Sequence, residues 1–246
     1  MRNISVSINS FLYIKKTREY IKANHWCVKY LIIPFVINSL LSIALWVFLF
    51  NIIQTFILSL GFLGAIPVFF SGVISFLVLV ITFLTTIYLF FLLANIIASP
   101  FNGLLTDKML SNAGIASESK TNVLSLITRE IIRAIKFEVL KLFLVLLLFI
   151  FSLIISVIPA IGVVLAGVLN FAGNTYLSLV DYFDPGLSYK GVNISSRFKY
   201  VKNVIKDSWG FFMISGLLMY TPFINIIYIP LAVITANLVL IEKEKS

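Results

Sequence analysis

Charged residues of this 246-residue chain occur in four islands that are separated by long uncharged stretches. The islands are Arg2 to Lys29, Asp107 to Lys141, Asp181 to Asp207 and Glu242 to Lys245, and they hold all 19 lysines and arginines. Positively charged loops stay on the cytoplasmic side of a membrane, so all four islands are expected there. Each uncharged stretch must then enter the bilayer and return, which predicts a multi-pass membrane protein with both termini cytoplasmic.

Residues that favour a bend lie near the middle of each uncharged stretch, at Ser59 to Pro67, Ile158 to Gly162 and Tyr220 to Phe223. The chain is therefore expected to form one membrane domain, residues 1–246, with three hairpins. Its parts are a long helical hairpin at 30–98, cytoplasmic or interfacial helices at 99–141, a second hairpin at 142–180, a cytoplasmic loop and interfacial helix at 181–207, and a re-entrant third hairpin at 208–241.

The first hairpin is predicted to contain two long transmembrane helices, Tyr30 to Ser59 and Pro67 to Ala98. Each has roughly 30 residues, or about 45 Å as a helix, against a hydrocarbon core of about 30 Å. The residue before a proline is disfavoured in a helix, so Ser99-Pro100 is expected to end the second helix. Asn102 would then cap a new helix on the bilayer surface.

The other two hairpins are predicted to be shallow. Leu142 to Val157 and Val163 to Val180 would span roughly 24 and 27 Å as helices, and Trp209 to Tyr220 only about 18 Å. Pro222 and Pro230 interrupt the third hairpin. Non-helical backbone at membrane depth must be surrounded by protein or water, so the third hairpin is expected to line a cavity or the interior of an assembly.

Three amphipathic segments are expected to lie on the membrane surface: Phe11 to Lys22, Thr121 to Lys136 and the segment that begins at Ile194. In the second of these, Leu124, Ile127, Ile131 and Ile135 form an apolar stripe, and Arg129, Arg133 and Lys136 share another face. We favour extension of these cations to lipid headgroups over a role in contacting a ligand. The fold class is therefore all-α integral membrane, with two long transmembrane helices, two partly penetrating hairpins and amphipathic interfacial helices.

Composition agrees with this assignment. Hydrophobic residues make up 60% of the chain and charged residues 12%, and the mean hydropathy is +1.06. The net charge of +9 comes from basic residues that flank apolar segments and alternate with acids, which favours anchoring to anionic lipids over nucleic-acid binding. His25 and Cys27 are the only residues of their kinds, so neither a histidine metal cluster nor an intrachain disulfide is expected.

Motifs for catalysis are absent from the sequence: it has no Ser-His-Asp set, no GxxxxGK loop and no zinc-ligand spacing. We therefore expect neither an enzyme nor a bound cofactor. The better candidate for chemistry is Gly186-Leu187-Ser188, after the turn predicted at Asp184-Pro185. Consecutive N–H groups at the start of a helix suit an oxyanion, and Lys190 and Lys29 would add positive charge. The alternative is a turn that only joins two helices.

Several blocks of this sequence resemble, in the same order, the CysZ family of bacterial sulfate permeases. The blocks are Ala98 to Leu105, Ile158 to Gly162, Asp181-Tyr182, Gly186 to Tyr189, and Pro222 to Asn225 with Pro230. The resemblance implies an oligomer in the bacterial inner membrane that takes up sulfate for sulfur assimilation, the route to cysteine biosynthesis. Its transport would be passive or coupled to an ion.

The resemblance also implies functional residues. Sulfate would be bound by Gly186, Leu187 and Ser188 together with Lys29, whose neighbour Val28 stands where the family has a second basic residue. A pore or gate would include Asn102, Asp107, Lys108, Glu138 and Lys141, although Glu138 and Lys141 would also pair simply as neighbours on one helix face. The expected partners are sulfate or a similar oxyanion, the lipid bilayer and further copies of the chain. The alternative function is a structural or scaffold membrane protein that has kept the fold without sulfate transport.

Overall fold

The computed structural model describes residues 10–59, 68–115, 123–207, 209–221 and 224–245. Within these ranges the chain is all-α and contains no strand. The helices are α1 (Ser10–Ala23), α2 (Cys27–Ser59), α3 (Val68–Asn112), α4 (Val123–Ser156), α5 (Gly162–Tyr189), α6 (Ile194–Asp207), α7 (Trp209–Met219) and α8 (Ile224–Lys245). The all-α prediction is therefore confirmed.

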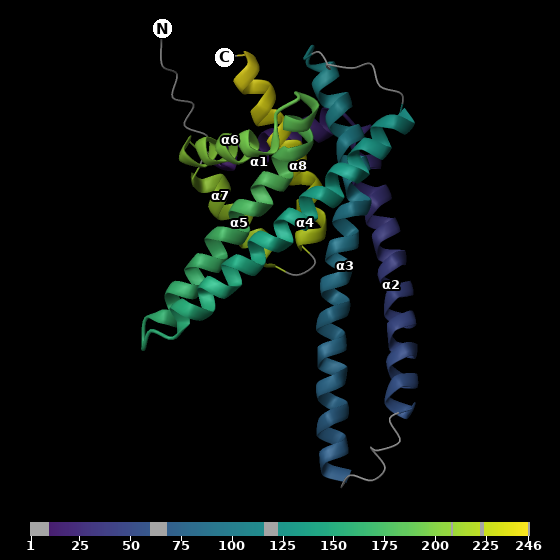
Figure 1. The fold of residues 1–246 in the computed structure, drawn as a ribbon. Coiled ribbons are helices and arrows are strands. Elements are labelled where there is room, and N and C mark those ends of the chain that lie inside the picture. Colours follow the sequence, from purple (N-terminus) through teal and green to yellow (C-terminus); the bar gives the residue numbers. More distant parts are fainter. Residues whose placement is uncertain (1–9, 60–67, 116–122, 208, 222–223, 246) are drawn as a thin grey trace.

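Two helical hairpins extend from a common body and diverge toward their tips (Figure 1). Helices α2 and α3 form one hairpin, and α4 and α5 form the other. Helices α1, α6, α7 and α8 gather at the opposite end, together with the adjoining ends of the hairpin helices. The first and last helices meet there, since the hydroxyl of Tyr13 donates a hydrogen bond of 2.8 Å to the carboxylate of Glu242.

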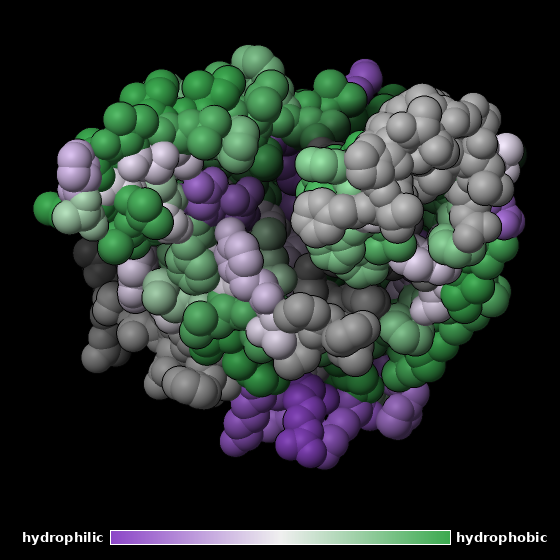
Figure 2. All heavy atoms as spheres, turned by 90° about the horizontal axis from the view of Figure 1, so that it is seen from below, coloured by the Kyte–Doolittle hydropathy of each residue, from purple (hydrophilic) through white to green (hydrophobic). Residues whose placement is uncertain are grey.

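Three segments in the described part of the chain are long and apolar enough to cross a membrane: Cys27–Ile53, Ile127–Ser156 and Gly162–Tyr189. The apolar segment Gly72–Thr86 of α3 is shorter. Hydrophobic residues cover most of the coloured surface in Figure 2, and the largest cluster of hydrophilic residues lies at one edge. The chain is a membrane protein by these criteria, while the division into two long spans and two shallow hairpins stays a prediction.

Three expected interruptions at proline are wrong. Pro100 lies inside α3, Pro185 inside α5 and Pro230 inside α8, and each helix continues past its proline. Asn102 therefore lies within α3 and does not cap a new helix. A proline leaves one carbonyl of the preceding turn unbonded, but helices that are packed among other helices tolerate this loss.

The amphipathic segment at Thr121 to Lys136 is not a separate surface helix, because α4 continues from it without interruption to Ser156. The two ends of its apolar stripe also point outward: Leu124 is 74% exposed and Ile135 45%, whereas Glu130 is buried at 2%. The apolar face of a membrane helix contacts lipid and its polar face contacts other helices, which is the reverse of a soluble protein.

Other predicted elements are confirmed. Helices α1, α6 and α7 occupy the segments expected from the sequence. The bend of the second hairpin lies at residues 157–161, where Ala160 has a positive φ of 63°. Much of the bend at Ser59 to Pro67, and the part of the third bend at 222–223, lie outside the described residues.

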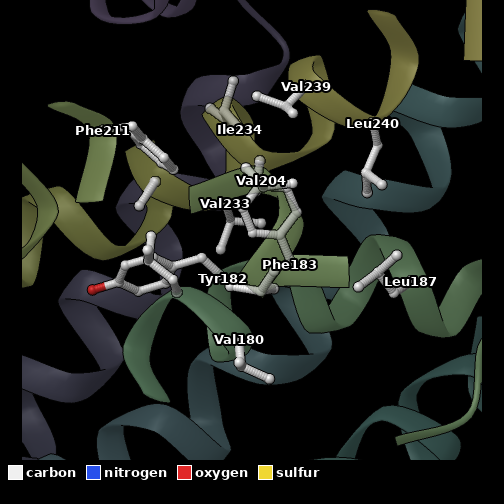
Figure 3. Packing of buried hydrophobic residues seen from close by; sticks show 14 of the residues in the cluster. Val180, Tyr182, Phe183, Leu187, Val204, Phe211, Val233, Ile234, Val239 and Leu240 are labelled. Carbon is white, nitrogen blue, oxygen red and sulfur yellow. The ribbon is translucent and has the colours of Figure 1, made fainter. Parts of the chain in front are cut away.

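The core of the body surrounds α8, which packs against α1, α2, α3, α5 and α7. Figure 3 shows Val233, Ile234 and Leu240 of α8 among side chains from the end of α5, such as Phe183 and Leu187. Cys27 is fully buried in the same core. This packing fixes the end of α5, where Asp181 and Asp184 lie.

Candidate functional site: a buried charged network

The segment Ser99 to Gly103 of α3 forms the surface on which α4 packs. The hydroxyl of Ser99 donates a hydrogen bond of 3.2 Å to the backbone carbonyl of Glu130. A Cβ atom at Gly103 would lie 2.5 Å from the Cγ of Glu130, so only glycine allows this approach. Small residues four positions apart are the usual means of bringing membrane helices together. They place the carboxylate of Glu130 inside the protein.

Arg133 joins three helices through its guanidinium. It donates to the carboxylate of Glu130 from Nε at 2.9 Å and from Nη2 at 2.5 Å, and Nη2 also donates to Ser99 at 3.1 Å. Its Nη1 pairs with Oδ2 of Asp184 on α5. The side chain of Arg133 is 13% exposed, so its interpretation as a cation extended to headgroups is wrong.

Asp184 is buried at 1% and also pairs with a second arginine. Nη1 of Arg197, on α6, pairs with Oδ1 of Asp184, and Nε of Arg197 donates to the carbonyl of Val192 at 2.7 Å. Burial lowers the pKa of Arg197 and the charge of Glu130 opposes this effect, but an arginine stays protonated under such conditions. Asp184 thus connects α4 with α6.

Lys141 forms a second group of contacts further along α4. Its ammonium donates to Glu138 at 2.5 Å and to Asp181 of α5 at 3.2 Å. The network as a whole contains four carboxylates and three cations. These are Glu130, Glu138, Asp181 and Asp184, and Arg133, Lys141 and Arg197.

A small cavity of about 20 Å³ lies along this network, which is room for about one water molecule. Its polar lining comes from Asn95, Ser99, Asn102, Arg133, Glu138, Asp181 and Asp184. The cavity therefore touches both groups of contacts. No group of three or more His, Cys, Asp or Glu residues in the described ranges is placed to hold a metal ion.

The structure brings three of the five predicted pore residues together. Asn102 and Glu138 line the cavity, and Lys141 pairs with Glu138. Lys108 instead lies over the ring of Trp26, with its Nζ 4.5 Å from the ring centroid. Neither Lys108 nor Asp107 lines this cavity.

The predicted oxyanion loop has a different geometry from the one expected. Gly186, Leu187 and Ser188 lie in the last turn of α5, so the expected turn at Asp184-Pro185 and the helix start after it are wrong. A Cβ atom at Gly186 would lie 2.7 Å from Oδ1 of Asn237 and would also collide with Leu240. This glycine therefore allows close packing of α5 on α8.

The two lysines expected beside this loop have other contacts. Lys190 pairs with Glu244 near the end of α8, and burial lowers the pKa of Lys190. Lys29 is exposed and lies 5.0 Å from the ring centroid of Tyr30. Among the described residues, Lys29 forms no ion pair within 4.0 Å.

Sequence reasoning missed the part of the network made by Glu130, Arg133, Asp184 and Arg197. One signal for it was present in the sequence: Glu130-Arg133 repeats the i, i+3 spacing of Glu138-Lys141 on the same helix. The role of Asp184 gave no such signal, because Asp-Pro-Gly is typical of a turn.

Comparison with known proteins places this chain in a family. A Vibrio atlanticus protein named "Sulfate transporter CysZ" is 30% identical over 229 residues, which cover 89% of this chain and 86% of the relative. A Vibrio cholerae protein of the same name is 28% identical over 225 residues, covering 89% and 87%. A Salmonella typhimurium protein of that name is 31% identical over 154 residues, covering 61% and 59%. The family described as "Sulfate transporter CysZ/Etoposide-induced protein 2.4" matches residues 13–230, and the chain belongs to this family.

Proposed function

We propose that this protein is a permease or channel that moves sulfate, or a related oxyanion, across the bacterial inner membrane and so supplies sulfur assimilation. The observation that carries the proposal is the buried charged network between α4, α5 and α6. Ionisable groups in a membrane protein are costly and usually serve the passage of a solute or proton. The names of the relatives support sulfate as the solute.

The orientation is proposed from the charge pattern: several membrane passes, with both termini in the cytoplasm. The meeting of Tyr13 and Glu242 supports placement of both ends of the described chain on one side. Assembly into a homo-oligomer is part of the proposal, since two diverging apolar hairpins leave a large surface for other copies and for lipid.

The path of the oxyanion is proposed to pass Asn102, Glu138 and Lys141, which lie along the cavity. Asp107 and Lys108 belong to the proposed path only as residues near its cytoplasmic end. The cavity is too small for an oxyanion as it stands, so transport requires the helices to separate around it.

Binding of the oxyanion by Gly186, Leu187, Ser188 and Lys29 is also proposed. Leu187 is buried at 1% and Gly186 is packed against α8, so their N–H groups are not available while the last turn of α5 is intact. Binding at this position requires that turn to unwind. Ser188 is half-buried, so its hydroxyl would reach a ligand with a smaller change in the conformation of α5.

The test is uptake of radiolabelled sulfate into liposomes that contain the purified full-length protein. Uptake above that of protein-free liposomes is expected. Lys29→Ala and Ser188→Ala should each lower it, whereas Lys22→Ala and Ser196→Ala, at exposed positions on α1 and α6, should not. Uptake equal to that of protein-free liposomes would refute transport of sulfate and favour the scaffold alternative. Equal uptake by all four variants would refute the site at Ser188 and Lys29.

A further inference from the structure

The carboxylate of Asp184 is divided between two arginines from different helices. Oδ2 pairs with Arg133 of α4, and Oδ1 pairs with Arg197 of α6. Two guanidinium groups therefore converge on two oxygens of one anion. All three side chains are buried: the exposed fraction is 13% for Arg133, 10% for Arg197 and 1% for Asp184.

Both arginines are also held by groups other than Asp184. Nε and Nη2 of Arg133 donate to Glu130, and Nη2 donates to Ser99. Nε of Arg197 donates to the carbonyl of Val192. These contacts hold Arg133 to α3 and α4 independently of Asp184, and they tie Arg197 to the segment that follows α5.

A tetrahedral oxyanion presents the same pattern to guanidinium groups as a carboxylate does. One edge of a sulfate or phosphate offers two anionic oxygens, and arginine binds both kinds of anion through paired N–H donors. We propose that Arg133 and Arg197 form an oxyanion-binding site and that Asp184 occupies it as an internal competing anion. The proposal rests on the proposed function in taking this oxyanion to be the transported one.

Asp184 and the oxyanion exclude one another. The adjoining cavity of about 20 Å³ holds about one water molecule, so an oxyanion has no room beside the carboxylate and must replace it. The helix is weakened at this point, because Pro185 has no N–H to donate to the carbonyl of Asp181. A change in the last turns of α5 is therefore the movement that would withdraw Asp184.

Removal of the charge on Asp184 should leave both arginines without the anion that they share, and among the described residues Glu130 is then the one carboxylate still in an ion pair with either of them. The test compares wild type with Asp184→Asn, each as purified full-length protein in detergent. The melting temperature is measured in sodium sulfate and in sodium chloride at equal ionic strength.

Asp184→Asn is expected to melt below wild type in chloride and to regain several degrees in sulfate, while wild type shows a much smaller difference between the two salts. The gain should disappear in Asp184→Asn/Arg197→Gln and persist in Asp184→Asn/Lys202→Gln, which removes an exposed cation from the same helix. Equal melting of Asp184→Asn in both salts, or a gain that survives Arg197→Gln, would overturn the proposal.

Purification itself is informative if Asp184→Asn is unstable. The proposal expects the variant to be recovered folded when sulfate is present throughout, and failure in both salts would count against it. The melting assay does not require transport. If sulfate stabilises Asp184→Asn but wild type takes up no sulfate, the proposed function is refuted and the binding site stands. If wild type takes up sulfate but sulfate does not stabilise Asp184→Asn, the binding site is refuted and the proposed function stands.

Discussion

Gly103 of α3 lies so close to Glu130 of α4 that a methyl group at position 103 would be 2.5 Å from the Cγ of that glutamate. Gly103→Ala should therefore push α4 away and disturb the contacts of Glu130 with Arg133. Overpacking of this kind costs about 1 to 3 kcal/mol. Thermal unfolding in detergent measures the loss, with Gly72→Ala on the same helix as control, because nothing lies within 4 Å of its added Cβ. Equal stability of the two variants would contradict the packing.

Gly186 gives a parallel prediction at the contact between α5 and α8. Gly186→Ala should destabilise the protein, because the new Cβ would meet Leu240 and Oδ1 of Asn237. Gly167→Ala is the matched control on α5, since its Cβ would enter open space. It should raise helix stability slightly, by about 0.5 to 1 kcal/mol. Thermal unfolding of both variants decides whether position 186 is restricted by packing.

Tyr200 should make the protein sensitive to alkaline pH. Burial raises its pKa to about 12 from an ordinary value of 10.0. Between these values the unfolded chain has lost the tyrosine proton and the folded protein keeps it, so the free energy of unfolding falls as the pH rises. The free energy of unfolding, measured from pH 9 to 12, should decline less in Tyr200→Phe than in wild type. An identical decline in both proteins would refute Tyr200 as the cause.

Tyr200→Phe should also be harmless at neutral pH. The hydroxyl of Tyr200 is buried and has no hydrogen-bond partner among the described residues. Its removal relieves the cost of burying a polar group without losing a bond. We expect a melting temperature equal to or above that of wild type. A clear fall would show that the hydroxyl has a stabilising contact.

Glu242 should stabilise the body more than an exposed ion pair does. It accepts a hydrogen bond of 2.8 Å from Tyr13 and pairs with Lys16 at 2.5 Å. Glu242→Ala should cost about 1 to 2 kcal/mol, since the ion pair alone is partly exposed and contributes little. Glu19→Ala, which removes the exposed pair of Lys15 and Glu19 at 3.9 Å, should cost almost nothing. Chemical unfolding of the two variants tests this difference.

The tip of the second hairpin should be inaccessible from the cytoplasm. Val163 is 72% exposed next to the bend, and native Cys27 is fully buried, so Val163→Cys would be the reactive thiol. An impermeant thiol reagent should fail to label it from the cytoplasmic side of vesicles, whereas Lys199→Cys on α6 should react there. Labelling of Val163→Cys from the cytoplasm would refute the hairpin topology. Reaction from the opposite side would indicate a full crossing.

The positions of most helices could be predicted from the sequence because hydrophobic length and charge depend on local composition. The prolines could not be assigned in the same way. Pro100, Pro185 and Pro230 predict interruptions by local rules, but all three lie in continuous helices. Tertiary packing decides whether a helix tolerates proline, and that packing involves residues distant in sequence.

The site was predictable only where family resemblance or spacing pointed to it. Asn102, Glu138 and Lys141 were expected and do lie together, whereas Arg133 was assigned to the lipid surface. A helix pattern alone does not say whether its polar face meets water or other helices. The partner that buries Arg133 is Asp184, which lies 51 positions later in the chain.

The pairing pattern on α4 has a consequence for synthesis of the protein. Glu130 pairs with Arg133, and Glu138 pairs with Lys141, so four of the six charged residues on this helix have partners within it. An isolated charge at the centre of an inserting helix costs about 2.5 to 3.5 kcal/mol. Self-paired charges would let α4 leave the translocation machinery before α5 and α6 have been made. Asp184 and Arg197 would then join an arginine that is already inserted, so the last charges of the network to be synthesised complete the site.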